Sequence, residues 1–442
     1  MEKFTHKDGE TFLWNGLPAI TICDKEKKYG AIFTNLNGKF TVIRIPFEEI
    51  NDEKNKIKAD EMGIFDCLKT NMDKLSDEFT VVLSLTEKCN SQCRYCFLDA
   101  KSTGKDLTVD MLHAGIDYAV SNAYDRPITF AAFGGEPGIK DNLLIEMVNY
   151  VNKKITENSQ LKVKFAITTN GILKKNVVDT LIQNNFRISL SMDGIQEVQN
   201  YQRPLIGNKN SYDSVIQNLK IFLANNLDVK IRATVTLFSV EKMAETVQEL
   251  SKYGVKKIHF EPVTPGGRGC TDNDLLQPPS SSIFVENLIK AIEVGAKVGV
   301  DVICFPYMNM LVAPIVFCDG RAKNRLVISP SGAVSSCVEI QEVDNPLFKA
   351  LGLGYYDSEA KKIVITADER RPAIRGCESL RQENNTNCKE CPMMFFCGGG
   401  CPTRNYRGTG MSNRVDIYRC EIIRGIMPYI LRKFYNSTFN AE

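Results

Sequence analysis

Short β-branched runs and longer segments with helical period alternate along the chain from Phe79 onward. The runs lie at residues 80–85, 128–133, 163–168, 187–191, 229–235 and 257–261. Between them, apolar residues recur every three to four positions at residues 109–122, 142–155, 174–184, 212–224 and 240–253. This alternation predicts strands joined by helical crossovers, and therefore a parallel sheet. Because such crossovers are right-handed, we expect an α/β fold with a partial (β/α)6 TIM-like barrel, whose reactive face lies just after the strands.

Two flanking regions depart from this pattern. Residues 1–78 alternate strand-like pieces with turns and end in a helical segment near 61–75, which predicts a small α+β module. Beyond about Pro306 the alternation fades, and Cys, Gly and turn residues take over. A region that buries little apolar surface needs another source of stability, and bound metal is the usual one. We therefore predict three domains, at 1–78, 79–304 and 305–442.

Composition indicates the class of protein and the compartment in which it works. The 442 residues are 43% apolar and 24% charged with a net charge of +2, which is ordinary for a soluble globular protein and gives no sign of a nucleic-acid partner. The first ten residues do not resemble a secretory signal, and no apolar run reaches the roughly 20 residues that cross a bilayer. We expect a cytoplasmic protein without a membrane partner. In that reducing compartment its 15 cysteines favour metal or redox sites over disulfides.

Three cysteines follow the first predicted barrel strand with C-x-x-x-C-x-x-C spacing, at Cys89, Cys93 and Cys96. One short loop can bring three such thiolates to three corners of a cubane and leave the fourth iron without a protein ligand. The alternatives are a zinc knuckle that lacks one ligand, or chance spacing in a cysteine-rich chain. The spacing favours the cluster, because structural zinc sites normally close with four ligands.

This loop resembles that of the radical S-adenosylmethionine (SAM) superfamily, and the resemblance extends from about Thr80 to the C-terminus. It implies a [4Fe-4S] cluster whose free iron is chelated by the amino and carboxylate groups of SAM. The resemblance also implies that an electron from the cluster cleaves SAM to methionine and a 5′-deoxyadenosyl radical, which abstracts hydrogen from the substrate. An external donor of the flavodoxin or ferredoxin type would supply the electrons. Tyr95 stands at the family's aromatic position, where it contacts adenine or simply packs.

Three polar segments at later strand ends also resemble SAM-binding segments of this superfamily. A GGEP motif follows the second strand, and the resemblance implies that its backbone meets the methionine amine of SAM. Polar residues after the third and fourth strands match segments that bind the ribose and carboxylate of SAM, although capping and turn roles remain open. The implied SAM contacts are Gly134, Gly135, Glu136, Pro137, Thr169, Asn170, Ser191 and Asp193. For Arg203 and Arg232 we expect surface salt bridges.

The C-terminal cysteines resemble the SPASM domain of radical SAM enzymes that mature peptides and proteins, with C-G-G-G-C-P at residues 397–402. The resemblance implies two auxiliary [4Fe-4S] clusters, and three clusters in all. The outer one would be held by Cys388, Cys391, Cys397 and Cys420, and the inner one by Cys318, Cys337 and Cys401. Cys304 is a candidate fourth inner ligand, an open inner site is the alternative, and a pair of zinc ribbons is the alternative for the whole domain. Outside these motifs, Cys23, Cys67, Cys270 and Cys377 read as small buried apolar residues.

The resemblance implies a peptide maturase that joins a ribosomally made precursor peptide through a thioether or carbon-carbon bond. Residues 1–78 would grip the leader of that peptide by adding a strand to a sheet edge, or serve as a structural cap. A rival is an anaerobic sulfatase maturase that forms formylglycine. Those enzymes place an aspartate after the second SPASM cysteine, where this chain has Val338 followed by Glu339. A zinc-stabilised or electron-transfer scaffold is a third reading. No catalytic base is identified.

Overall fold

The computed structural model describes residues 78–269, 273–304, 324–367, 397, 400–412 and 414–433 in full, with backbone alone for residues 11–14, 17–24, 29–36, 39–46 and 434–439. The chain divides into two compact units. One comprises residues 1–74, 305–318 and 374–442, and the other comprises residues 75–304 and 319–373. The predicted three-domain division stays a prediction.

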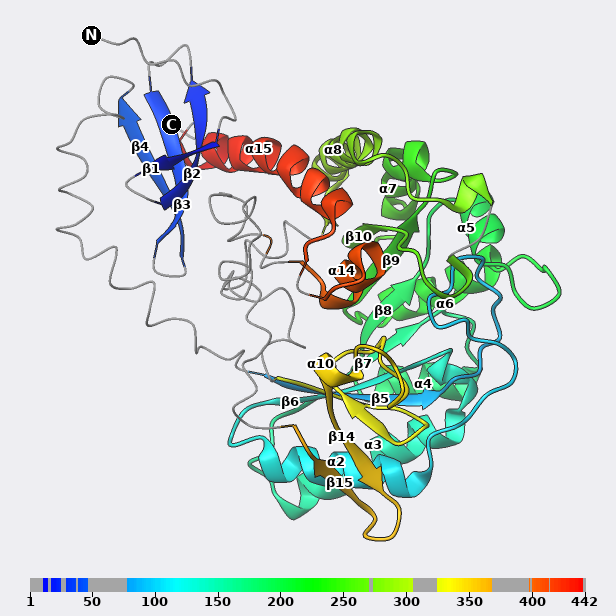
Figure 1. Cartoon of the computed structure of the whole chain (residues 1–442). Coiled ribbons are helices and arrows are strands. Elements are labelled where there is room, and N and C mark those ends of the chain that lie inside the picture. The colour runs from blue at the N-terminus through cyan, green and yellow to red at the C-terminus, as the bar shows by residue number, and fades with distance from the viewer. Residues whose placement is uncertain are drawn as a thin grey trace. The chain divides into compact units, whose positions relative to one another are not determined.

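The larger unit is built on one sheet with the strand order β11-β10-β9-β8-β7-β6-β5-β12-β13-β14-β15 (Figure 1). Neighbouring strands from β12 through β5 to β11 are parallel, and β13 to β15 continue the sheet as antiparallel strands. The strands are β5 (Phe79–Thr86), β6 (Ile128–Gly134), β7 (Val163–Thr169), β8 (Arg187–Ser191), β9 (Val229–Val235), β10 (Lys257–Pro262), β11 (Asp301–Ile303), β12 (Arg325–Ile328), β13 (Ala333–Ser335), β14 (Gly352–Asp357) and β15 (Lys362–Ile365). The predicted α/β fold with a mostly parallel sheet is confirmed.

Helical crossovers join the parallel strands. Those predicted from the sequence appear as α2, α3, α4, α6 and η4 with α7, within a few residues of the expected ends, whereas α5 was not predicted. Their bounds are α2 (Val109–Asn122), α3 (Asp141–Glu157), α4 (Lys175–Gln183), α5 (Gln196–Gln202), α6 (Tyr212–Ala224), η4 (Val240–Lys242), α7 (Met243–Ser251) and α8 (Ser281–Val298). A further short helix, α10 (Phe348–Leu351), precedes β14.

The two faces of the parallel sheet differ in chemistry. In β9, buried apolar residues alternate with half-buried Lys230, Arg232 and Thr234. Pairing places Arg232 beside Ser191 of β8 and His259 of β10, so one face carries a polar row. The opposite face is apolar and packs on helices, as where Leu83 of β5 lies against α2. This leaves the polar face available to line a site.

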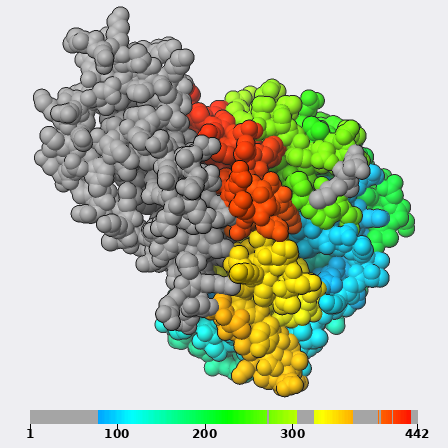
Figure 2. Space-filling model, viewed as in Figure 1, coloured from blue at the N-terminus to red at the C-terminus, as the bar shows by residue number. Residues whose placement is uncertain are grey.

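The C-terminal strands of this sheet extend it beside α2. The β14–β15 turn contributes Lys361, whose Nζ lies 2.8 Å from Asp110 Oδ2 at the start of α2. Residues 324–367, which include this hairpin, form the yellow to light-orange surface in Figure 2. Because β12 pairs with β5, residues 325–365 continue the barrel sheet rather than forming a separate layer.

The smaller unit contains a four-stranded antiparallel sheet of β1 (Thr11–Trp14), β2 (Leu17–Asp24), β3 (Tyr29–Leu36) and β4 (Lys39–Pro46). It also contains α14 (Pro402–Thr409) and α15 (Ile417–Phe439). The predicted helix near 61–75 lies outside the described residues. Across the described part of the chain, every helix is too short or too polar to cross a membrane.

Candidate active site

The three predicted cluster cysteines lie in one irregular loop between β5 and α2. Cys89 is buried, and Cys93 and Cys96 are half-buried. Backbone hydrogen bonds order the loop, with Cys89 N donating to Lys101 O at 2.7 Å and Cys96 N donating to Cys93 O at 3.3 Å. Within the described residues, no three Cys, His, Asp or Glu side chains are gathered as for a single metal ion. Ligation by the trio therefore stays a prediction.

The surroundings of Cys89 and Cys93 disfavour the thiolate form, which would therefore need a nearby positive charge. Burial raises the pKa of Cys89 to about 12, and the neighbouring Glu136 carboxylate adds to the effect. Burial likewise raises the pKa of Cys93. A bound iron cluster supplies the missing charge and deprotonates its ligands. Hydrogen-bond donors also face the sulfurs, with Ser91 N at 3.4 Å from Cys89 Sγ. The loop therefore fits an iron-sulfur cluster by charge and by hydrogen bonding.

The GGEP motif binds the backbone that leads into this loop. Gly135 N donates to Thr86 O and Glu136 N donates to Lys88 O, both at 2.8 Å. A Cβ at Gly135 would lie 2.2 Å from Lys88 O, and one at Gly134 would lie 2.2 Å from Thr86 O. Both positions need glycine because two backbone segments touch there. The glycines thus serve contact between the β5 and β6 ends, and their contact with SAM stays a prediction.

Glu136 points into the protein and joins the ends of β6 and β7. Its carboxylate accepts hydrogen bonds from Gly138 N at 2.9 Å, Thr169 Oγ1 at 2.8 Å and Asn170 N at 2.6 Å. Burial raises its pKa to about 7 despite these three donors. Pro137 follows as the first residue of η3 (Pro137–Ile139). Glu136 and Thr169 therefore share a buried network.

Asn170 carries that network into the cysteine loop. Its Nδ2 lies 2.7 Å from Asn90 Oδ1, 2.9 Å from Ser91 Oγ and 3.8 Å from Cys89 Sγ. Its Oδ1 accepts from Ile172 N at 2.9 Å, which fixes the orientation of the amide. The end of β7 thus holds the loop beside its first cysteine.

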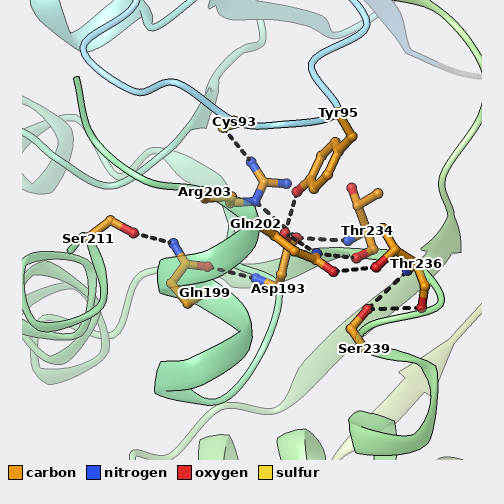
Figure 3. A network of polar contacts seen from close by, with 10 residues as sticks. All are labelled: Cys93, Tyr95, Asp193, Gln199, Gln202, Arg203, Ser211, Thr234, Thr236 and Ser239. Carbon is orange, nitrogen blue, oxygen red and sulfur yellow. Dashed lines mark hydrogen bonds and ion pairs between the residues drawn. The ribbon is translucent and has the colours of Figure 1, made fainter. Parts of the chain in front are cut away.

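Asp193 performs the same task from the end of β8 (Figure 3). Its buried carboxylate accepts hydrogen bonds from the Tyr95 hydroxyl, from Gln202 Nε2 at 2.7 Å and from Thr234 N at 2.9 Å. Arg203 Nε completes the set as an ion pair at 2.9 Å from Oδ1. Tyr95 is itself buried, so its hydroxyl is used inside the protein. Its contact with adenine stays a prediction.

The expectation of a surface salt bridge was wrong for Arg203. Its side chain is 12% exposed and pairs with a carboxylate that is 0% exposed. Burial disfavours the charged guanidinium, but Asp193 outweighs it and holds the pKa of Arg203 above its ordinary value. Arg203 Nη1 also lies 3.9 Å from Cys93 Sγ. Ser191 is half-buried, and its contact with SAM stays a prediction.

A fourth strand end holds the loop through a residue that sequence reasoning missed. Arg268, after β10, donates from Nε to Cys93 O at 2.9 Å and from Nη1 to Ala100 O at 2.8 Å and Asp99 Oδ1 at 3.0 Å. The preceding Gly267 has φ +52, and a Cβ there would lie 2.3 Å from Cys96 O. The available signal was the P-G-G-R-G run at residues 265–269, shortly after the sixth predicted strand.

Charged side chains also lie on the polar face of the sheet. Arg232 Nη1 lies 3.1 Å from His259 Nδ1, and His259 Nε2 lies 3.2 Å from Glu261 Oε2. Burial, reinforced by Arg232, lowers the pKa of His259 to about 4, so the imidazole is neutral near pH 7. The polar face therefore presents a neutral histidine between a cation and a carboxylate.

Only some of the predicted auxiliary ligands fall on described residues. Cys337 follows β13 in the larger unit, whereas Cys397, Cys401 and Cys420 belong to the smaller unit. Cys318, Cys388 and Cys391 lie outside the described residues, as do Cys67, Cys270 and Cys377. Cys23 is described by backbone only, and Cys304 is buried. The two auxiliary clusters stay predictions.

Comparison with known proteins agrees with this geometry. Residues 83–250 match the family model of the Radical SAM superfamily. An uncharacterized protein from Methanocaldococcus jannaschii is 27% identical over 42% of this chain, and the match spans 63% of that protein, less than two thirds of its length. A cysteine-type anaerobic sulfatase-maturating enzyme from Clostridium perfringens is 21% identical over 80% of this chain and 96% of its own.

Two solved structures share the fold. The structure of anSMEcpe with bound AdoMet superposes with a TM-score of 0.63 at 17% identity, covering 82% of this chain and 96% of that one. Streptococcus suis SuiB bound to precursor peptide SuiA gives a TM-score of 0.53 at 15% identity, over 88% and 96% of the two chains. At these identities the likeness shows the fold alone. The family match identifies an enzyme and supports SAM and a [4Fe-4S] cluster as its cofactors. By this match, residues 83–250 form a radical SAM domain.

Proposed function

We propose that this enzyme is a peptide maturase whose SAM-binding [4Fe-4S] cluster is held by Cys89, Cys93 and Cys96. The observation that carries the proposal is the attachment of this one loop to four strand ends, through Gly135, Asn170, Asp193 and Arg268. When bound, the cluster with SAM supplies a 5′-deoxyadenosyl radical that abstracts hydrogen from the substrate. A loop fixed in this way holds its cysteines in one arrangement before any cofactor binds.

The residues after the strands act as supports in this proposal. Glu136, Asn170 and Asp193 bond to the loop or to one another, and their side chains spend their hydrogen-bonding capacity inside the protein. Contact with SAM is left to the backbone of the GGEP turn, where Gly135 is half-buried, and to half-buried Ser191 at the end of β8. Two further [4Fe-4S] clusters, bound by the seven C-terminal cysteines predicted above, complete the proposed set of cofactors.

The proposed substrate is a ribosomally made precursor peptide, joined internally through a thioether or carbon-carbon bond. Relatives named as sulfatase-maturating enzymes and the SuiB structure with precursor peptide SuiA support a polypeptide substrate. Half-buried Ser191 and Arg232, which lie side by side on the polar face of the sheet, would give an extended chain hydrogen-bonding partners. The β1–β4 sheet presents β1 and β4 as edges among the described strands, which suits leader binding by strand addition. An external donor of the flavodoxin or ferredoxin type would supply electrons.

Sulfatase maturation is the second candidate, favoured by relatives that match about four fifths of this chain. Against it, Val338 occupies the position of the aspartate implied by that family, and its carbonyl accepts from Gln341 Nε2 at 2.6 Å. Glu339 is the adjacent carboxylate and is half-buried. Fragmentation mass spectrometry with an aldehyde-reactive hydrazide separates the candidates, because formylglycine leaves one side chain as an aldehyde whereas a crosslink joins two residues and leaves no aldehyde. The intact mass alone does not separate them, since oxidation of Ser to formylglycine and formation of one crosslink both remove two hydrogen atoms.

The test of the proposal is anaerobic purification with iron and sulfide analysis, followed by reduction in the presence of SAM. Replacing Cys89, Cys93 and Cys96 by Ala should abolish formation of 5′-deoxyadenosine and leave most auxiliary iron bound. As the matched variant, Cys397→Ala with Cys420→Ala should remove auxiliary iron and peptide turnover while some uncoupled SAM cleavage survives. Cleavage of SAM by the first variant would refute the assignment of the loop.

A further inference from the structure

The second cysteine of the loop has a buried cation beside its sulfur. Arg203 Nη1 lies 3.9 Å from Cys93 Sγ, and the guanidinium carbon lies 5.3 Å from the centre of the Tyr95 ring. The Arg203 side chain is 12% exposed, so solvent screens its charge only weakly. Figure 3 shows the guanidinium between the cysteine and the Asp193 carboxylate. A positive charge and an acidic carboxylate therefore lie in line behind one predicted cluster ligand.

We propose that Arg203 and Asp193 act as an opposed pair that sets the reduction potential of the SAM-binding cluster, with Arg203 raising it and Asp193 lowering it. This inference rests on the proposed function, because it requires a cluster on Cys93. In it Arg203 is a positioning and tuning residue rather than a catalytic one.

The physical basis is the change in charge on reduction. One added electron makes the cluster and its thiolates more negative, so an N–H donor and a cation at a ligand sulfur stabilise the reduced form. Asp193 opposes this in two ways. Its carboxylate partly cancels the charge of Arg203 through the 2.9 Å ion pair, and it is itself an anion close to the cluster. The two residues must therefore shift the potential in opposite directions.

A purely structural role predicts something different. If the pair only clamps Tyr95 and the loop, loss of either member loosens the same contacts, and both losses should disturb the cluster in the same direction. The sign of the shift is consequently a readout that a clamp alone would not reproduce. Asp193→Asn keeps the size of the side chain and its acceptor oxygen, whereas Arg203→Met keeps much of the stem and removes the charge.

The experiment is an anaerobic redox titration of the full-length enzyme, followed by electron paramagnetic resonance of the signal that changes when SAM is added. Arg203→Met should lower the potential and Asp193→Asn should raise it, each by at least a tenfold change in the one-electron reduction constant, or about 59 mV. Arg94→Met is the control, because this arginine of the same loop stacks on Tyr201 at 4.5 Å and bonds to Asn208 at 3.3 Å instead of facing a sulfur. It should shift the potential by less.

Each outcome decides the matter. Opposite shifts support the inference, while unchanged potentials, or shifts in the same direction, overturn it. If Arg203→Met assembles no cluster, Asp193→Asn decides by its sign alone. If Asp193→Asn also fails, Arg203→Lys, which keeps the charge, must retain a potential near that of the unaltered enzyme for the inference to stand. Absence of any SAM-responsive cluster in the unaltered enzyme would instead overturn the proposed function.

Discussion

Replacing Gly135 by Ala tests whether contact between the ends of β5 and β6 holds the cysteine loop. The added Cβ would lie 2.2 Å from Lys88 O and 2.7 Å from Glu87 O, and both neighbours are backbone atoms that cannot rotate away. To relieve the overlap the two segments must separate, which breaks or stretches the bonds from Gly135 N to Thr86 O and from Glu136 N to Lys88 O. Lys88 immediately precedes Cys89, so the movement is transmitted to the first predicted ligand.

The cost follows from these contacts. Two backbone hydrogen bonds are worth about 0.5–1.5 kcal/mol each, and overpacking adds about 1–3 kcal/mol. We therefore expect Gly135→Ala to lower the free energy of unfolding by about 2–6 kcal/mol. Gly207→Ala is the control, because its φ is +78 and no atom lies within 4 Å of a Cβ there. It should cost only the backbone strain of about 1–2 kcal/mol.

The assay is denaturant unfolding of the cluster-free protein followed by circular dichroism, together with iron content after anaerobic reconstitution. Gly135→Ala should unfold at lower denaturant concentration than Gly207→Ala and should retain several-fold less iron at the SAM-binding site. Equal stability of the two variants would show that the ends of β5 and β6 can separate at little energetic cost. Reduced stability with full iron content would show that the β6 end does not position the loop.

Three further predictions concern the other attachments of the loop. The pKa of Glu136 is raised from 4.5 to about 7, so its contribution to stability is full below pH 4.5 and is lost as the pH rises through 7. The free energy of unfolding of the cluster-free protein should therefore fall by about 3 kcal/mol over that window, and Glu136→Gln should flatten the pH profile. A flat profile in the unaltered protein contradicts this. Arg268→Ala leaves the carbonyls of Cys93 and Ala100 without their hydrogen-bond donor, which costs about 1–3 kcal/mol for each carbonyl. It should lower iron content more than Arg268→Lys, which keeps the charge but lacks the planar guanidinium. Equal iron content in the two variants would argue against this role. Asn170→Ala should speed iron loss to a chelator because Asn90 and Ser91 lose their shared donor, whereas Asn225→Ala, at the exposed end of α6, should not; equal rates would refute the link from β7 to the loop.

The parallel strands were predicted well from the sequence, because the spacing of apolar and β-branched residues within a short segment distinguishes strands from helices. Strands 229–235 and 257–261 were recognisable from β-branched runs, and they appear as β9 and β10 with nearly the same bounds. The short helix α5 was missed, since it interrupts the expected loop after β8 with only 7 residues. The strands β12 to β15 were also missed, because each spans 3 to 6 residues within a segment rich in turns.

The polar residues at strand ends were located by the sequence, but their orientation was not. Motif position alone assigned Glu136, Asn170 and Asp193 to SAM, which stays a prediction. The structure adds that their side chains also bond to distant neighbours, 33 to 98 residues away in the contacts with Thr169, Ser91 and Tyr95. Whether a side chain at a strand end turns inward depends on the partners that the fold brings there. A single sequence does not contain that information, and the same limit hid Arg203 and Arg268.

The cysteine loop illustrates why those inward contacts matter. It has no helix or strand of its own, so the energy that fixes its path has to come from outside, and it comes from segments after β6, β7, β8 and β10 that are separated by up to about 175 residues. Each attachment closes a long chain segment and therefore costs conformational entropy that only the complete barrel repays. It follows that the cysteines cannot be arranged before the sheet has formed, and that damage at any of the four ends should reach the loop. Loss of iron through substitutions so far apart in sequence would be the mark of one shared support, because independent sites would fail independently.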